Sequence, residues 1–417
     1  MLKESDAAKA SRASAVWRAD YSTALHVRGI KGSDNRACVQ AIGDVLRIEG
    51  FERPTAQDAV SSLAFHGCHA LQSVPESIGQ LTGLTSLDFR ECSRLVSVPE
   101  TIGNLAGLTS LHFRECSRLV SVPESIGQLT GLTRLDFNWC EALESVPESI
   151  GQLTGLTSLE FRGCKALQSV PESIGLLTGL KSLDFTWCNA LQSVPESIGQ
   201  LAGLTSLDFR ECSRLESVPE TIGNLAGLKS LDFSGSYALQ SMPESIGQLT
   251  GLTSLSFERC FSLQSVPETI GQLAGLTRLS FERCNTLKRV PESIGLLTGL
   301  KSLSFERCFS LQSVPESIGQ LAGLTSLNYS VCSRLESVPE SIGQLTGLTA
   351  LELPSCQDGV VRAAVEALTL KSPRTLIKES AVNWDDSELV VLSLSELPGR
   401  AAIKVWVSKN KRALVPL

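Results

Sequence analysis

One segment recurs at a constant interval, in register, through most of this chain. Residues 84–95 are followed by a Val-Pro-Glu triplet at 98–100, and both return at 108–119 and 122–124. A fixed period of this kind predicts a solenoid, in which each copy is one structural unit that packs against its neighbours. Because a solenoid grows by stacking, the length of 417 residues does not set a number of globular domains.

Two columns of residues define how far the repeats extend. A leucine column runs at the same interval from Leu63 through Leu87 to Leu351 and predicts thirteen strands, while a proline column from Pro75 to Pro339 marks twelve complete repeats. Around Leu87 apolar and polar residues alternate, which is typical of a short strand with one buried side. The apolar columns of one copy cannot be covered by that copy alone, so neighbouring repeats must stack.

The repeat resembles the leucine-rich repeat family, whose signature is L-x-x-L-x-L-x-x-N/C-x-L. The copy that begins at Leu84 has Cys92-x-x-Leu95 where the family has Cys-x-Leu, and this departure is consistent. The Val-Pro-x-x-Ile-Gly-x-Leu segment is most similar to plant-type repeats, as in plant disease-resistance receptors and bacterial type III effectors. The resemblance implies an α/β leucine-rich repeat solenoid (horseshoe), with a parallel concave sheet, a convex side of 3₁₀ or short helices, and a protein partner.

The period divides the chain into three parts, of which residues 60–356 form the repeat array. Residues 1–59 are predicted to form an N-terminal helical cap with helices at about 5–21 and 33–46. A cap would cover the apolar end of the array and its unpaired strand edge. A flexible leader or the remnant of another domain are the alternatives.

Residues 357–417 are predicted to form a C-terminal cap with a basic tail. A helix is expected at 358–370, and strands or partly buried segments at 387–394 and 401–407. The tail carries several lysines, so a docking role for it remains an alternative to a solvated end.

Twelve of the thirteen cysteines fall in one column, which begins at Cys68 and ends at Cys356. Ser236 replaces cysteine in one copy, so the position requires a small side chain that forms a weak hydrogen bond, not a thiolate. Parallel side chains do not converge on one point, so we expect neither a metal nor a cofactor here. Cys38 lies off the column without an obvious base beside it, which predicts an idle thiol.

Composition and motifs argue against several classes of function. The net charge of −7 without an evident basic face argues against nucleic acid as a partner. The chain has no apolar run long enough to span a membrane, and the polar N-terminus lacks the apolar core of a secretory signal. Phosphate-loop, G-x-S-x-G and kinase signatures are also absent. We therefore expect a monomeric, non-enzymatic protein that is cytoplasmic or delivered into a host cell.

The segment Cys356-Gln357-Asp358 resembles the Cys-x-Asp motif of one family of bacterial leucine-rich-repeat ubiquitin ligases. In that family the motif lies in a large helical domain, whereas only the short segment 357–417 follows Cys356 here. We favour a recognition scaffold in immune-type signalling or as a secreted effector. A ligase-type effector whose repeats select the substrate, and a structural array without a specific partner, are the alternatives.

Two tryptophans stand on the otherwise polar surface of the strands. Trp139 and Trp187 occupy the column that starts with Glu91, two copies apart, with Gly163 between them. Strand spacing places them roughly 10 Å apart and predicts a slot with aromatic walls above Gly163. Exposed tryptophans are frequent anchors of protein interfaces, although duplication could also have copied one tryptophan that lies flat. The predicted binding residues are Asp136, Asn138, Trp139, Arg162, Gly163, Asp184, Thr186 and Trp187.

Overall fold

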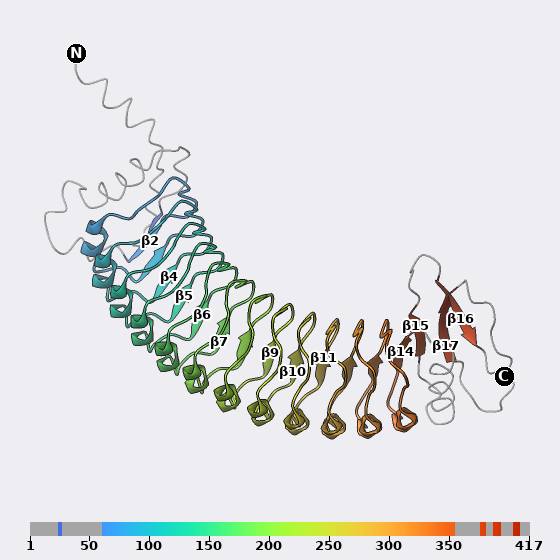
Figure 1. Ribbon diagram of the computed structural model, residues 1–417. Helices are drawn as coiled ribbons and strands as arrows, with labels where there is room; N and C mark the ends of the chain where they lie inside the picture. The colour runs from blue at the N-terminus through green and yellow to red at the C-terminus, as the bar shows by residue number, and fades with distance from the viewer. Residues whose placement is uncertain (1–23, 27–60, 355–375, 381–386, 393–402, 409–417) are drawn as a thin grey trace, which may run out of the picture. The chain divides into compact units, whose positions relative to one another are not determined.

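The computed structural model describes residues 24–26, 61–354, 376–380, 387–392 and 403–408. The chain divides into two compact units, Met1–Leu207 and Asp208–Leu417, and each contains a series of repeats (Figure 1). The helices predicted at 5–21, 33–46 and 358–370 lie outside the described residues, as do Cys38 and Cys356.

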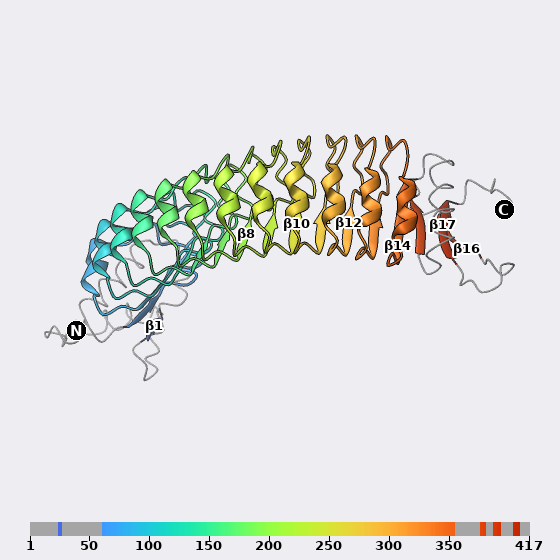
Figure 2. The ribbon, with the colours of Figure 1, turned by 90° about the horizontal axis from the view of Figure 1, so that it is seen from below.

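Each repeat contributes a short strand and, on its opposite side, a 3₁₀ helix (Figure 2). Proline precedes every one of these helices: Pro99, for example, is the N-cap of Glu100–Asn104 with a φ of −75°. The proline ring fixes φ near this value and has no N–H that would need a partner. The helix ends at Leu105, whose N–H donates to the carbonyl of Ile102. The proline column therefore sets where each 3₁₀ helix begins.

In the unit Met1–Leu207 the strands pair in parallel and in register, from β1 to β7, with leucine opposite leucine in the repeats. The strands are β1 (Ala24–His26), β2 (Ser62–Ala64), β3 (Ser86–Asp88), β4 (Ser110–His112), β5 (Arg134–Asp136), β6 (Ser158–Glu160) and β7 (Ser182–Asp184). The 3₁₀ helices are η1 (Glu76–Gln80), η2 (Glu100–Asn104), η3 (Glu124–Gln128), η4 (Glu148–Gln152), η5 (Glu172–Leu176) and η6 (Glu196–Gln200). Strand β8 (Ser206–Asp208) contains the division between the units.

In the unit Asp208–Leu417 the strands from β9 to β14 also pair in parallel. These strands are β9 (Ser230–Asp232), β10 (Ser254–Ser256), β11 (Arg278–Ser280), β12 (Ser302–Ser304), β13 (Ser326–Asn328) and β14 (Ala350–Pro354). The helices are η7 (Glu220–Asn224), η8 (Glu244–Gln248), η9 (Glu268–Gln272), η10 (Glu292–Leu296), η11 (Glu316–Gln320) and η12 (Glu340–Gln344). The thirteen strands β2–β14 match the leucine column and confirm the predicted solenoid.

Stacked aromatic rings fill the core behind the strands. From Phe65 to Phe185, successive rings lie nearly parallel with centroids 5.4–5.6 Å apart. The second unit has the same kind of stack, which runs from Phe209 to Tyr329. All these rings are fully buried. Offset-stacked aromatic pairs stabilise a core beyond the area that they bury, so each repeat is held by its neighbours.

The cysteine column is a hydrogen-bonded ladder, as the sequence predicted. The thiol of Cys116 donates to the carbonyl of Phe89 in the preceding repeat at 3.1 Å, and the Ser236 hydroxyl makes the same bond to Phe209 at 3.1 Å. The cysteines of the described repeats are free thiols and buried. Burial raises the pKa of the Cys116 thiol well above its usual value. These groups are therefore neutral parts of the core.

Strands outside the repeats extend the sheet in each unit. In the first unit, β1 lies within the part predicted as a helical cap, and it pairs with β2 in parallel. In the second unit, β15 (Leu376–Ser380) follows β14 in parallel, and β16 (Ser387–Leu392) and β17 (Ile403–Ser408) form an antiparallel pair. The positions of β16 and β17 agree with the predicted strands at 387–394 and 401–407, whereas β1 and β15 were not predicted. None of the helices in the described residues is long and apolar enough to cross a membrane.

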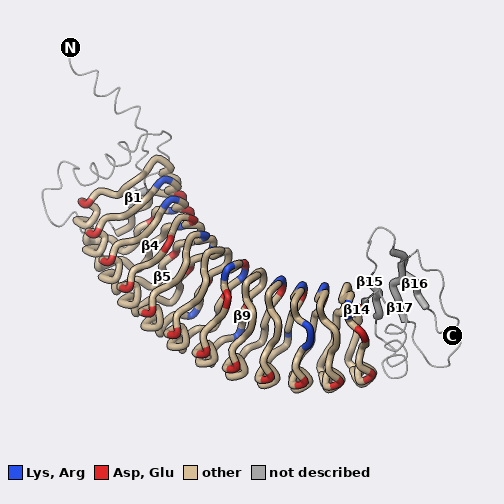
Figure 3. Tube along the Cα trace, viewed as in Figure 1, with Lys and Arg blue, Asp and Glu red and all other residues tan. Residues whose placement is uncertain are grey.

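A row of acidic residues follows the 3₁₀ helices within each unit (Figure 3). Glu100 lies in the first turn of η2. In the structure its Oε2 accepts the backbone N–H of Ser125 in the next repeat at 3.2 Å, and Glu124 does the same for Ser149 at 3.3 Å. These glutamates therefore join consecutive repeats.

Candidate functional site

One column of residues, three positions after the end of each of the strands β2–β13, has a left-handed backbone and is called the left-handed column here. Glu91, which follows β3 (Ser86–Asp88), is one member. The φ is positive at three glycines, Gly67, Gly163 and Gly235, and at nine other residues of the same column. The nine are Glu91, Glu115, Trp139, Trp187, Glu211, Arg259, Arg283, Arg307 and Val331, with φ between 57° and 66°. Glycine adopts this conformation without strain, whereas other residues lose roughly 1–2 kcal/mol in it. The chain thus keeps side chains at a position where glycine would be more stable.

Trp139 lies against the next repeat in this column. A Cβ placed on Gly163 would lie 2.6 Å from Cε3 of the Trp139 indole, so the ring covers the glycine backbone closely. The predicted open slot above Gly163 is therefore wrong, because the Trp139 ring occupies that space. Contact with a residue that lacks a side chain buries one part of the indole, and burial of apolar surface is favourable.

Trp187 remains on the surface. The residue is 40% exposed, and its backbone φ is 66°. The preceding residue, Thr186, is 2% exposed, and its N–H donates to Asp184 Oδ1 at 2.8 Å. Asp184 and Thr186 therefore hold the turn that presents Trp187, and Thr186 is not available as a contact for a ligand.

Asp136 and Asn138 are also buried below the surface. Asp136 is 4% exposed, and its Oδ1 accepts the N–H of Asn138 at 2.9 Å. Asn138 donates to Glu160 Oε2 at 2.6 Å and accepts the N–H of Arg162 at 2.9 Å. These contacts fix the turn beside Trp139. Arg162 itself is exposed and Asp184 is half-buried. The predicted residues that a partner could reach are therefore Trp139, Arg162, Asp184 and Trp187.

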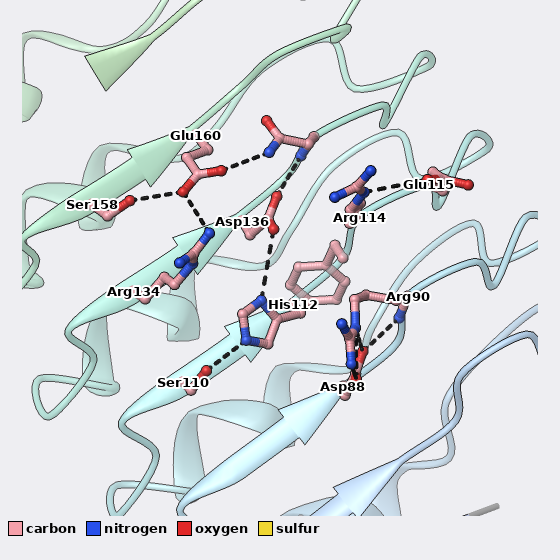
Figure 4. Close-up of polar contacts among 12 residues, drawn as sticks. Asp88, Arg90, Ser110, His112, Arg114, Glu115, Arg134, Asp136, Ser158 and Glu160 are labelled. Atoms are coloured by element: carbon pink, nitrogen blue, oxygen red, sulfur yellow. Dashed lines mark hydrogen bonds and ion pairs between the residues drawn. The ribbon is translucent and has the colours of Figure 1, made fainter. Parts of the chain in front are cut away.

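A polar network that the sequence did not predict lies next to this turn (Figure 4). His112 Nε2 lies 2.7 Å from Ser110 Oγ, and its Nδ1 lies 3.7 Å from Asp136 Oδ2. Burial would raise the pKa of Asp136, but contacts with His112, the N–H of Asn138 and the nearby Arg134 together lower that pKa. Asp136 is therefore an anion at neutral pH, and it anchors the network.

Arg134 and Ser158 complete the network by holding Glu160. Arg134 Nη2 donates to Glu160 Oε1 at 2.8 Å, and Ser158 Oγ donates to the same oxygen at 2.9 Å. In the sequence, His112 stands in a column of acidic residues and Arg134 in a column of serines. These two exceptions were the available signal for the network.

A recess of about 360 Å³ borders Trp139. Its lining consists of Ser93, Glu115, Ser117, Trp139 and Glu141. Ser93, Glu115 and Ser117 belong to the two repeats before Trp139, whereas Gly163 belongs to the repeat after it. The indole therefore separates the Gly163 backbone from the recess. Among the residues that the structure describes, no three His, Cys, Asp or Glu side chains gather as a metal site requires.

Family models match the repeats of both units. Residues 63–162 match a model described as a leucine-rich repeat region, and residues 209–336 match the BspA type leucine-rich repeat region. Together with the parallel strands and the 3₁₀ helices, these matches define the chain as a leucine-rich repeat protein. No curated protein matches the chain significantly.

Solved structures with the same fold are distant in sequence. A leucine-rich repeat protein of Leptospira interrogans is 25% identical over 78% of this chain and 97% of its own, with a TM-score of 0.38. The ectodomain of the plant receptor kinase GASSHO1/SCHENGEN3 from Arabidopsis thaliana is 19% identical over 77% of this chain and 56% of its own, with a TM-score of 0.30. The leucine-rich repeat domain of the type III effector XopL is 21% identical over 62% and 72%, with a TM-score of 0.36.

Proposed function

We propose that this protein is a non-catalytic recognition scaffold that binds a protein partner on the strand side of the unit Met1–Leu207. Leucine-rich repeat domains are generally protein-binding scaffolds, and both family models support that class. Repeat arrays present extended surfaces on which single columns vary independently of the core. The contact residues that we assign are Trp139, Arg162 and Trp187.

The observation that carries this proposal is the placement of two tryptophans at the outward turn of the repeats. Both have a left-handed φ, at a column position where neighbouring repeats have glutamate or glycine. The left-handed φ recurs throughout this column, so the tryptophan side chain is what distinguishes these two repeats. Tryptophan is also enriched among residues that dominate binding energy in protein interfaces. Both features favour selection for the side chains rather than for the fold.

The setting that we propose is immune-type signalling or action as a secreted effector, with the protein cytoplasmic or delivered into a host cell and monomeric. Support comes from the Val-Pro-x-x-Ile-Gly-x-Leu segment, which is similar to repeats of both groups. The ubiquitin-ligase alternative depends on Cys356, which lies outside the described residues. Nothing among the described residues favours it.

The test is capture of partners from the native source with a double variant, Trp139→Glu with Trp187→Glu. Glutamate occupies the same position at Glu91 and Glu115 with the same left-handed φ, so the variant should fold. We expect loss of the partner that the unchanged protein captures. The matched control is Arg283→Ala with Arg307→Ala, which changes two residues of the same column in the other unit. Equal recovery of the partner by the tryptophan variant would refute the proposal.

A further inference from the structure

The recess beside Trp139 combines an aromatic face with negative charge. Its charged lining residues are Glu115 and Glu141, and the remaining polar ones are Ser93 and Ser117. Tryptophan is the aromatic side chain that attracts cations most strongly. A carboxylate beside the ring adds charge-assisted hydrogen bonds, which are stronger than neutral ones. The lining thus matches a planar cation that stacks on the indole and donates hydrogen bonds at its edges.

The second unit contains a filled example of this arrangement. There the Arg259 guanidinium carbon lies 5.4 Å from the centre of the Tyr237 ring, and Nη1 donates to Glu211 Oε1 at 3.1 Å. Nη2 donates to the Tyr237 hydroxyl at 2.6 Å. Glu211 in turn lies over Gly235, since a Cβ on that glycine would be 2.6 Å from the Glu211 carboxyl carbon.

The first unit also has an aromatic ring, carboxylates and a glycine at these column positions, but different repeats supply them. Trp139 takes the place over a glycine, and Glu115 precedes it in the left-handed column. Glu141 lies two positions after Trp139, as Tyr237 lies two positions after Gly235. No arginine lines this recess, which remains open with a volume of about 360 Å³. In the second unit an arginine of this chain contacts the aromatic ring and one carboxylate. In the first unit the ring and two carboxylates are left for an arginine from another molecule.

Two basic residues already touch these carboxylates, but each contact uses one oxygen. Arg114 Nε lies 3.3 Å from Glu115 Oε1, and Lys165 Nζ lies 2.8 Å from Glu141 Oε1. All four side chains are between 44% and 51% exposed. Exposed ion pairs of this kind stabilise little. They leave Oε2 of both glutamates for a further donor.

We propose that the recess binds an arginine side chain of the protein partner, with the guanidinium stacked on Trp139 and hydrogen-bonded to Glu115 and Glu141. The inference rests on the proposed function and adds the chemistry of the contact. It assigns Glu115 and Glu141 as binding residues, and it makes Trp139 the centre of the recess. Trp187 then contacts another part of the partner.

The direct test uses acetyl-Gly-Arg-Gly-amide and its citrulline counterpart as probes of the full chain. Citrulline keeps the shape of arginine but lacks the charge. In ¹⁵N-labelled protein, we expect the arginine peptide to shift the indole N–H resonance of Trp139 at millimolar concentration and to leave that of Trp187 unmoved. The citrulline peptide should shift the Trp139 resonance at least fivefold less. Equal shifts with both peptides, or no shift of Trp139 with arginine, would overturn the proposal.

A matched variant, Glu115→Gln with Glu141→Gln, keeps the size and the left-handed residue while removing the charges. We expect the arginine-induced shift to fall at least fivefold and the captured partner to bind at least tenfold more weakly, with the rest of the spectrum unchanged. If this variant keeps full affinity for the partner while the tryptophan variant loses it, the arginine contact is wrong and the proposed function stands. If neither variant changes partner binding, both proposals fail.

Discussion

Each non-glycine residue in the left-handed column lowers stability but places a side chain on the surface that a partner can contact. Glycine would be the most stable choice there, yet nine of the described repeats have another residue. Val331, with φ of 60°, is the most strained type among them, because a branched Cβ fits the left-handed region poorly. The left-handed φ recurs at the same position of each repeat. The loss of folding stability that each side chain causes there can therefore be measured by substituting one position at a time.

Replacing Val331 by glycine and by alanine separates this strain from lost contacts. Both variants remove the branched side chain, but alanine keeps a Cβ in the left-handed region. We expect Val331→Gly to have a free energy of unfolding about 1 kcal/mol higher than Val331→Ala. Urea denaturation of the two proteins gives the difference. A glycine variant that is no more stable than the alanine variant would show that the position carries no backbone strain.

Because Trp139 contacts Gly163, the effect of a substitution at Gly163 on stability should depend on the residue at position 139. Gly163→Ala places a methyl group 2.6 Å from Trp139 Cε3 and also introduces strain at φ of 77°. In the Trp139→Gly background the clash is gone and the strain remains. We expect the two substitutions to couple by roughly 1–3 kcal/mol, as residues in contact do. A double-mutant cycle by urea denaturation measures it, and additive effects would mean that the ring does not lie on Gly163.

Glu282 gives a prediction on pH, because it is partly buried beside like charges. Burial, and then Glu306 and Glu258, raise the pKa of Glu282, although Arg283 and Arg307 oppose them. A raised carboxyl pKa favours the folded state at low pH, and this contribution is lost as the pH rises through the folded-state pKa.

We therefore expect Glu282→Gln to raise the midpoint of urea unfolding at pH 7. This gain should shrink as the pH falls from the raised folded-state pKa towards the ordinary glutamate pKa, and it should vanish below that, where Glu282 is protonated in both states. Midpoints measured between pH 3 and pH 7 provide the check. A gain that stays constant across this range would point to a cause other than charge.

The repeat as an element is held together by backbone carbonyls that meet side chains of the next copy. Cys164 Sγ donates to the carbonyl of Phe137 at 3.2 Å, and serine makes the same bond at Ser236. Alanine at this position would remove the thiol donor, although the carbonyl would keep the N–H of Cys140 at 3.0 Å. The net contribution of one such hydrogen bond is about 0.5–1.5 kcal/mol.

We expect Cys164→Ala to lower the free energy of unfolding by about 1 kcal/mol more than Cys164→Ser. Chemical denaturation of both variants under reducing conditions measures this difference. If alanine is tolerated as well as serine, packing rather than the hydrogen bond explains the cysteine column.

Most of the array could be predicted because its pattern repeats. The leucine column located strands β2–β14, and the proline column located every 3₁₀ helix that the structure describes. Strand β1 could not be predicted, because Ala24–His26 lies outside the period and pairs with Ser62–Ala64, which is distant in the sequence. No local pattern encodes such a contact.

The site was harder to predict than the fold. The sequence placed Trp139 and Trp187 on the surface, but it gave no direction for their side chains. Their left-handed backbone turns Trp139 onto Gly163, which closed the expected slot. The contact between His112 and Asp136 joins two repeats, so it depends on side-chain conformation across the sheet rather than on spacing. The glycines at three positions of the left-handed column were the available sign that its backbone has a positive φ.

For the molecule as a whole, the repeats separate stability from recognition. Core columns are nearly constant, and the buried rings and thiols recur from copy to copy. Outward positions can change without disturbing the stack, which is how repeat arrays acquire specific surfaces. Recognition through Trp139, Arg162 and Trp187 therefore requires that the partner touches the strand side of Met1–Leu207 and leaves the 3₁₀ side free.

Site-specific crosslinking tests this requirement most directly. A photo-reactive phenylalanine analogue replaces Arg162, which is exposed beside Trp139, or Leu176, which is 54% exposed in η5 of the same unit. With the captured partner, we predict a strong crosslink from position 162 and none from position 176. A crosslink from position 176 with none from position 162 would contradict recognition through the strand side.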